Sequence, residues 1–217
     1  MTLAVILLLL SRVYFLRRER NLPRVRRSGT CSLAVFLGSG GHTMEALSLV
    51  NSLDFTRYTP RTYIVSEGDA LSIQKARALE RLKLSRNEIV AIGEYRVITI
   101  PRARHVHQKL FQTVPTALLS LLVSFYHVTV APFFAAPISE VLLLNGPGTC
   151  FVLCIATYLN RLLGLPSPKL IYVESFARVK TLSLSGRLLR SMVDSFVVQW
   201  PDLLKEGGRG VYHGWLV

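Results

Sequence analysis

The chain has 217 residues, 50% of them hydrophobic, and a formal net charge of +13. This length accommodates one sizeable domain with an appendage and excludes two full doubly wound domains. The charge would suit a nucleic-acid partner, but nearly half of it lies in residues 1–27 beside an apolar segment, and no strand interleaves aromatic and basic residues. The sequence therefore argues against nucleic-acid binding.

The first element is the apolar segment Leu3 to Leu16. Arginines follow this segment instead of preceding it, and no small-residue cleavage site appears, so it is predicted to be a retained anchor and not a signal peptide. As a helix, residues 2–16 would extend about 22 Å, which leaves open whether the anchor spans the bilayer or lies in its interface. We predict a membrane anchor over 1–17 and a basic linker over 18–30; a basic linker without a membrane role is the alternative.

A glycine-rich turn follows the apolar run Leu33–Leu37, with the sequence Gly38-Ser39-Gly40-Gly41-His42-Thr43. A strand that leads through such a turn into a helix, here near His42–Leu53, directs free N–H groups and the positive end of the helix dipole to one spot. Such a spot binds anions, above all phosphate. The turn is not a dinucleotide fingerprint, because Thr43 replaces the third glycine, nor a P-loop, because the lysine is missing.

The next elements alternate between strand and helix patterns. We predict strands at Arg61–Ser66 and Arg96–Ile100 and helices near Asp69–Leu84 and Val106–Val130. Two arginines, Arg102 and Arg104, close the third strand, and guanidinium groups suit phosphate oxygens or anionic head groups; a solvated basic loop is the alternative. The very apolar stretch Val114 to Ala136 contains helix-breaking prolines, so a helix lying on the sheet or dipping into the bilayer surface is favoured over a second span.

A second strand-turn-helix unit follows further along the chain. The strand Val141–Leu144 leads into Asn145-Gly146-Pro147-Gly148-Thr149 and then into an apolar helix over Thr149–Leu163. Two such units indicate two loops at the carboxyl edge of one parallel sheet, which is where open α/β sheets bind ligands. The repetition therefore favours a phosphorylated ligand.

The last predicted elements are strands at Leu170–Glu174 and Ser195–Gln199 and a helix near Thr181–Met192. The βαβα alternation predicts a doubly wound, mostly parallel, Rossmann-like sheet in one α/β domain over residues 31–217.

With these features, the chain resembles the asparagine-linked glycosylation protein fourteen family, membrane-anchoring subunits of a UDP-N-acetylglucosamine transferase. The matching segments run in order through nearly the whole domain: Gly38–Glu45, Asp69–Ser72 with Lys75, Ile100–Arg104, Asn145–Cys150, Ile171–Ser175 with Ala177–Val179, Leu182–Gly186 and Val198–Pro201. The chain departs from the usual sequence of this family at two places. His105 stands where the family usually has Glu, and Glu206-Gly207-Gly208 replaces a usual Tyr-Pro turn.

The resemblance implies the N-terminal acceptor half of a split glycosyltransferase of the B fold. The implied reaction is inverting transfer of N-acetylglucosamine (GlcNAc) from UDP-GlcNAc to the 4-hydroxyl of dolichyl-diphosphate-GlcNAc, the second step of dolichol-linked oligosaccharide synthesis. The implied partner is a soluble UDP-GlcNAc-binding catalytic subunit of the asparagine-linked glycosylation protein thirteen family, without which the chain is expected to be inactive. The implied location is the endoplasmic reticulum membrane, single-pass with a cytosolic domain, and the nuclear envelope membrane as a second site.

Candidate site residues follow from the turns and from this resemblance. The base for the attacking hydroxyl is His42, whose alternative role is to bind the diphosphate, or Glu174, whose alternative role is to orient a neighbour. The residues assigned to the acceptor diphosphate are Gly38, Gly40, Gly41, Thr43, Arg102, Arg104, Asn145, Gly148 and Thr149. No cofactor is expected, and the lack of a D-x-D motif predicts no metal site.

The C-terminal residues Trp215, Leu216 and Val217 are predicted to dock on the separate subunit, because an exposed apolar terminus would otherwise favour aggregation. The alternative is that they complete the domain's own core. A self-sufficient membrane-associated enzyme that binds nucleotide sugars is the rival function, although the acidic ribose ligand expected about 20 residues after the first turn is not clearly supplied.

Overall fold

The structure is a computed structural model that describes Ser11 and residues 29–85, 95–104, 108, 113–134, 139–146, 148–205 and 207–217. The predicted anchor, apart from Ser11, and nearly all of the predicted linker lie outside the described residues, as do His105 and Glu206. The predicted Rossmann-like domain is described over most of its length.

One parallel sheet of seven strands forms the centre of the domain, in the order β3-β2-β1-β4-β5-β6-β7. The strands are β1 (Leu33–Leu37), β2 (Arg61–Ser66), β3 (Tyr95–Ile100), β4 (Val141–Asn145), β5 (Lys169–Val173), β6 (Ser195–Val198) and β7 (Val211–Tyr212). The six predicted strands and the parallel Rossmann-like class are confirmed, whereas β7, with two residues, was not predicted. The order reverses between β1 and β4, which makes the carboxyl ends of these two strands the topological switch point.

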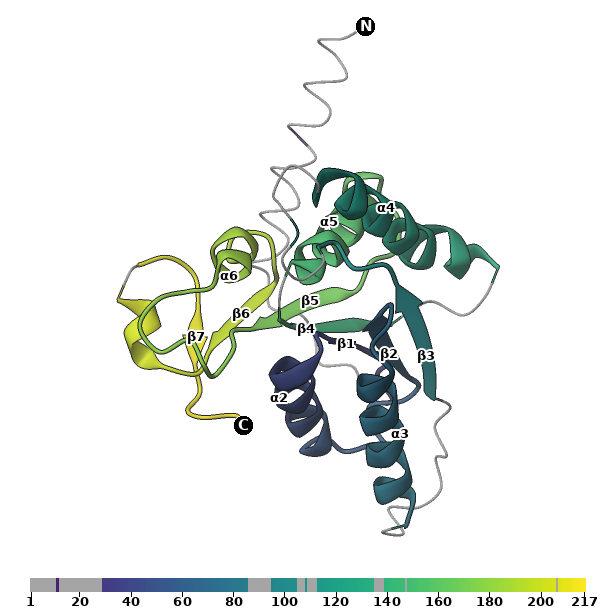
Figure 1. Cartoon of the computed structure of the whole chain (residues 1–217), viewed down its shortest axis with the longest axis horizontal. Helices are drawn as coiled ribbons and strands as arrows, with labels where there is room; N and C mark the ends of the chain where they lie inside the picture. The colour runs from purple at the N-terminus through teal and green to yellow at the C-terminus, as the bar shows by residue number, and fades with distance from the viewer. Residues whose placement is uncertain are drawn as a thin grey trace, which may run out of the picture.

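Helices cover both faces of this sheet, with α2 and α3 on one face and α4 and α5 on the other (Figure 1). The helices are α2 (Gly40–Asn51), α3 (Ala70–Ser85), α4 (Thr113–Phe125), a π-helical turn at Tyr126–Val130, α5 (Thr149–Leu162) and α6 (Leu184–Leu189), with 3₁₀ turns at Ala131–Phe133 and Pro201–Leu204. The predicted helix at Thr181–Met192 is therefore shorter than expected, because Ser183 caps α6 by accepting a hydrogen bond from the Gly186 N–H.

Alternate residues of β1 enter two different cores. Leu33, Val35 and Leu37 face the α2 side, whereas Ala34 and Phe36 face the α5 side. All five residues are buried, as expected for a central parallel strand with helices on both faces. This burial holds the end of β1, and hence the first glycine turn, in a fixed place.

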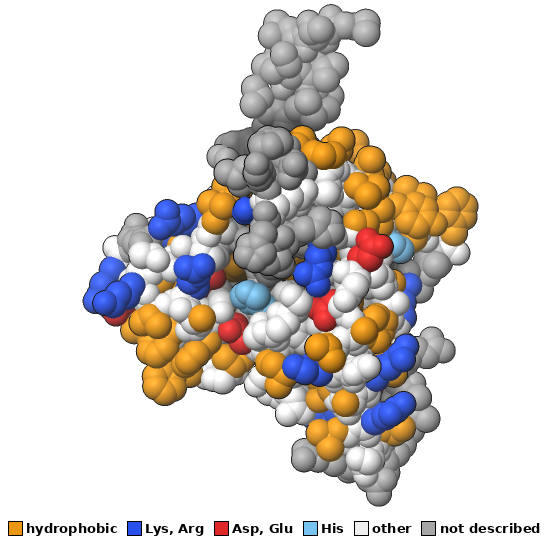
Figure 2. All heavy atoms as spheres, viewed as in Figure 1, with side chains coloured by type: hydrophobic (Ala, Val, Ile, Leu, Met, Phe, Trp, Pro, Cys, Tyr) orange, Lys and Arg blue, Asp and Glu red, His pale blue; other side chains and the backbone are white. Residues whose placement is uncertain are grey.

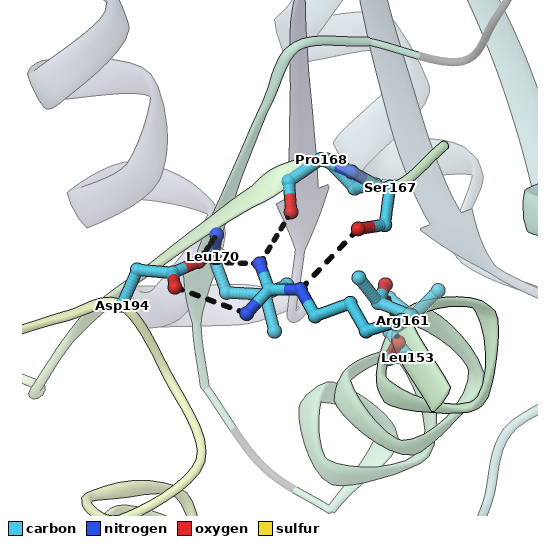
Figure 3. A network of polar contacts seen from close by, with 7 residues as sticks. Leu153, Arg161, Ser167, Pro168, Leu170 and Asp194 are labelled. Atoms are coloured by element: carbon cyan, nitrogen blue, oxygen red, sulfur yellow. Dashed lines mark hydrogen bonds and ion pairs between the residues drawn. The ribbon is translucent and has the colours of Figure 1, made fainter. Parts of the chain in front are cut away.

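A buried ion pair holds the end of α5 against the sheet (Figure 3). The Arg161 guanidinium donates to both carboxylate oxygens of Asp194 and to the Pro168 carbonyl oxygen, and an oxygen of Asp194 accepts the Leu170 N–H at 2.7 Å. Because both side chains are at most 9% exposed, removing either partner would leave a buried charge unpaired. The pair thereby fixes the direction of α5, whose opposite end begins at the second glycine turn.

The helix α4 packs on α5 with two buried serines beside Leu121 and Phe125, and turns three of its leucines outward. Ser120 and Ser124 are fully buried, while Leu118, Leu119 and Leu122 are each more than half exposed. Apolar side chains accordingly gather over α4 on the surface (Figure 2). Among the described residues, the stretch Thr113–Val130 is the one helix long and apolar enough to cross a membrane, and 22% of it is buried inside the protein.

Candidate functional site

The two glycine turns meet at the switch point of the sheet. Leu37 of β1 and Asn145 of β4 are paired in register, so the turns leave neighbouring strands side by side. A Cβ placed on Gly146 would lie 3.2 Å from His42 Cγ and 3.4 Å from Gly38 Cα. The structure thus brings together the two loops that the sequence predicted to lie at one edge.

Both turns open into helices whose first amides face this edge. The first turn reaches α2 through Ser39 at φ 66° and Gly40 at φ 54°, and α5 begins directly after Gly148. In the part of the chain that is described, Ser39 makes no side-chain cap hydrogen bond, and Gly148 has no side chain with which to make one. The N–H groups of both first turns are therefore oriented as in known anion sites.

The backbone beside these amides is open. An ideal Cβ on Gly40, Gly41 or Gly148 would meet no heavy atom of the described chain within 4 Å. Gly38, in contrast, is buried at the end of β1. Gly40, Gly41 and Gly148 leave room for a ligand to approach the backbone. Gly38 instead packs inside the turn.

His42 and Asn145 form the polar pair at the centre of the site. His42 Nδ1 lies 3.0 Å from Asn145 Oδ1. Asn145 is completely buried, and His42 is half-buried. The amide thus holds the imidazole at the edge of the sheet, with its second ring nitrogen directed away from Asn145.

The two threonines of the site use their hydroxyl groups inside the protein. Thr43 Oγ1 lies 2.6 Å from Ser72 Oγ, which in turn donates to Asp69 Oδ2 at 2.6 Å, so it joins α2 to α3. Thr149 Oγ1 accepts the Ala103 N–H at 3.3 Å. The hydroxyl group of Thr43 therefore joins two helices, and that of Thr149 holds the segment at Ala103.

The hydrogen bond to Ala103 places the basic segment after β3 beside the second turn. On either side of Ala103, Arg102 Nε donates to the Glu67 carbonyl oxygen and Arg104 Nε and Nη2 donate to the Gln108 carbonyl oxygen. Arg104 is exposed and Arg102 is half-buried. The guanidinium groups keep further N–H donors for an anion.

Glu174, the second candidate base, lies beneath the site and is only 1% exposed. Its carboxylate accepts the Ser175 N–H, the Ser183 N–H and the Ser183 hydroxyl, each at 3.1 Å. Burial raises the pKa of this carboxyl above its ordinary value, and the hydrogen bonds from Ser183 and Ser175 oppose that shift. The arrangement favours the orienting role of Glu174 over that of a base that meets a substrate hydroxyl.

Glu45, which the sequence did not single out as a site residue, connects α2 to the segments at the ends of β4 and β5. Its Oε2 accepts the Asn145 side-chain N–H at 2.9 Å and the Phe176 N–H at 3.3 Å, and its Oε1 accepts the Ser175 hydroxyl at 2.8 Å. The signal was available, since Glu45 follows His42 by three residues and so lies on the same helix face.

The C-terminal residues divide between core and surface. Leu216 packs against the core on the α2 side, and its N–H donates to Gln199. Trp215 is 65% exposed and stands edge-on to Phe176 and beside Trp200. Val217 is 39% exposed. The tail is therefore tied to the domain through Leu216, while Trp215 lies at the surface in an aromatic cluster with Phe176 and Trp200.

Comparison with solved structures supports the fold. The domain superposes on MurG from Acinetobacter baumannii with a TM-score of 0.52 at 14% identity, covering 83% of this chain and 45% of that one. A UDP-N-acetylglucosamine 2-epimerase from Listeria monocytogenes, described as putative, gives a TM-score of 0.51 at 15% identity and covers 82% of this chain and 43% of that one. The chain thus spans less than half of these proteins and matches them in fold.

Comparison with curated sequences is closer. A relative from Cryptococcus neoformans is 41% identical over 98% of this chain and 93% of its own length, and one from Homo sapiens is 36% identical over 99% and 94%. Both are named UDP-N-acetylglucosamine transferase subunit ALG14. The model of the family described as oligosaccharide biosynthesis protein Alg14 like matches residues 33–216, which include both glycine turns and the aromatic cluster. The chain therefore belongs to the Alg14 family.

Proposed function

We propose that this chain is the acceptor-binding, membrane-anchoring subunit of an N-acetylglucosaminyltransferase that extends dolichyl-diphosphate-GlcNAc with GlcNAc from UDP-GlcNAc. The observation that carries the proposal is the meeting of two uncapped helix N-termini with the His42–Asn145 pair at the switch point. Membership of the Alg14 family, whose curated members bear a transferase-subunit name, gives the reaction class.

The acceptor diphosphate lies against the two turns in this proposal. The amides of Gly40, Gly41 and Thr43 face it from α2, and those of Gly148 and Thr149 face it from α5. Two helix dipoles directed at one anion, with open backbone beside them, favour a dianionic group over a neutral sugar. Arg102 and Arg104 add positive charge from the segment that Thr149 holds in place.

The chemistry is an inverting displacement at the anomeric carbon of the donor sugar. The acceptor O4 forms a bond to C1 as the bond from C1 to the UDP oxygen breaks, and UDP departs with that electron pair. The proton of the attacking hydroxyl passes to the ring nitrogen of His42 that does not face Asn145. Glu174 holds the Ser183 segment under the site and does not take part in proton transfer.

The donor is bound by a separate soluble subunit in this proposal, since this chain supplies the acceptor half of the fold. Trp215 and Val217, which are both exposed, are proposed to form part of the surface that recruits the subunit. Leu216 anchors this tail to its own domain.

The membrane holds the domain with its switch point near the lipid head groups. The predicted anchor over 1–17 supplies the attachment, and the outward leucines of α4 give the folded domain an apolar surface that a bilayer interface would cover. We propose the cytosolic face of the endoplasmic reticulum membrane as the location.

Reconstitution tests this function. The chain in lipid vesicles is expected to transfer GlcNAc to a polyprenyl-diphosphate-GlcNAc acceptor only when the UDP-GlcNAc-binding subunit is added. His42→Ala is expected to lower transfer roughly a hundredfold or more, while Trp215→Ala should weaken capture of the subunit by the vesicles. Transfer by this chain alone, or binding of UDP-GlcNAc by it alone, would instead establish the self-sufficient enzyme.

A further inference from the structure

Glu45 lies at the junction of the site, and its carboxylate makes its described hydrogen bonds within the protein. Its carboxylate connects α2 to the ends of β4 and β5 through Asn145, Ser175 and Phe176. A residue with contacts of this kind can act on the reaction only through its neighbours, here through Asn145 and then His42.

The orientation of the Asn145 amide is fixed by its hydrogen-bond partners. Its Nδ2 donates to Glu45 Oε2 at 2.9 Å and to the Val173 carbonyl oxygen at 3.3 Å. Carboxylate and carbonyl oxygens only accept hydrogen bonds, so the reversed amide would place an acceptor against two acceptors. Glu45 and Val173 together therefore fix which end of the amide faces His42.

The oriented amide in turn decides which nitrogen of the His42 imidazole carries the hydrogen. The atom that Asn145 presents to it is Oδ1, at 3.0 Å from Nδ1. An amide oxygen cannot donate, so Nδ1 must carry the hydrogen. In the neutral ring Nε2 is then the nitrogen with the free electron pair.

We propose that Glu45 is a positioning residue that, through Asn145, holds His42 in the Nδ1–H form with Nε2 free to accept the proton of the attacking hydroxyl. This inference deepens the proposed function and rests on it for the role of His42 in transfer. The tautomer of His42 itself depends on the contacts among these three side chains and on the Val173 carbonyl oxygen.

The contacts of Glu45 predict which replacements preserve its role. Oε2 serves both Asn145 and Phe176, while Oε1 serves only the hydroxyl of Ser175, which can rotate. In Glu45→Gln the amide oxygen can take the place of Oε2, and the new NH₂ group can donate to Ser175 Oγ. Glu45→Asp keeps the charge but is one methylene shorter, so it cannot reach Asn145, Ser175 and Phe176 together.

The experiment uses the full chain with ring-¹⁵N-labelled histidine, reconstituted with its UDP-GlcNAc-binding subunit. The His42 signals are assigned by their loss in His42→Ala. Wild type and Glu45→Gln are expected to show a single neutral form with hydrogen on Nδ1. Glu45→Asp and Glu45→Ala are expected to show a mixture of tautomers and a kcat about tenfold lower. The KM for UDP-GlcNAc is expected to stay the same, because the partner subunit binds the donor.

Glu67→Ala is the matched control, because Glu67 is an exposed carboxylate near the site whose described hydrogen bonds use its backbone. It should change neither the ring signals nor kcat. The proposal is overturned if Glu45→Asp keeps wild-type ring signals, or if Glu45→Gln loses the single tautomer while remaining folded. Should His42→Ala retain full transfer, the proposed function of His42 fails, and the ring signals still decide what Glu45 does.

Discussion

The two glycine turns look alike in sequence, but they are built for different tasks. The first turn reaches α2 through two consecutive residues at positive φ, Ser39 and Gly40. Its glycines Gly40 and Gly41 border open space. In the second, Gly146 is at φ 126° and packs against His42, while Gly148 is helical and open. Some glycines of this site therefore let a ligand approach, whereas Gly146 lets one turn approach the other.

The backbone of the first turn is also strained. Ser39, at φ 66° and ψ 157°, occupies a region that is almost restricted to glycine. Such strain is typical of ligand-binding turns and costs about 1–3 kcal/mol. The comparison predicts four mutational effects, from the largest to the smallest.

Replacing Gly146 should have the largest effect. In Gly146→Ala the methyl group would meet the His42 ring at 3.2 Å on a backbone that disfavours any side chain. We expect a loss of about 2–3 kcal/mol in the free energy of unfolding, measured by denaturant titration, and a loss of most transfer activity. Gly148→Ala is the control and should stay within about 0.5 kcal/mol of wild type; equal destabilisation by both variants would refute the distinction.

Replacing Gly186 should rank next, although this glycine lies outside both turns. A Cβ there would fall 2.0 Å from Glu174 Oε2, and the carboxylate would have to leave the Ser183 and Ser175 donors. We expect Gly186→Ala to cost about 1–3 kcal/mol by thermal unfolding. A variant as stable as wild type would show that Glu174 does not hold this segment.

A bulky residue at Gly41 should leave the fold intact and impair binding. In Gly41→Leu the side chain would extend into open space, so unfolding should be unchanged. The same side chain would occupy the place proposed for the diphosphate, and transfer at low acceptor concentration should fall about tenfold, or 1.4 kcal/mol. Undiminished transfer by this folded variant would exclude the first turn from acceptor binding.

Relieving the strain at Ser39 should have the smallest effect. Glycine adopts the observed backbone without penalty, but it also gives the unfolded chain more freedom, at a cost of about 0.4–1 kcal/mol. We therefore expect Ser39→Gly to raise the free energy of unfolding by about 1 kcal/mol, within a range of about 0–2.6 kcal/mol, as measured by the denaturation midpoint. A clear destabilisation would mean that the Ser39 side chain holds the turn.

Much of the fold followed from short-range patterns. The strand β1 has its predicted bounds, because a central parallel strand is a continuous apolar run that ends at glycine or polar residues. The strand β2 also has its predicted bounds, although polar residues stand at both of its ends. The orientation of α4 was harder to predict, because three of its leucines face outward while its serines are buried. Composition identifies such a helix as apolar but does not tell which face is buried.

The sequence was enough to predict which turns lie at the site, but not which hydrogen bonds join them. Two turns after parallel strands had to share an edge, so the meeting of Gly38, His42 and Asn145 was predictable. That Glu45 would bridge Asn145 to Phe176 depends on how segments far apart in the sequence lie next to one another.

The sequence by itself determined the alternation of strands and helices and the two glycine turns, because each depends on the conformational preferences of a few neighbouring residues. The tertiary structure decided which carboxylate is buried, which glycine is packed and which nitrogen of His42 faces Asn145. Those outcomes depend on the positions of atoms from segments 100 or more residues apart in the chain, as in the bond between Asn145 and Glu45, and only packing brings such atoms together.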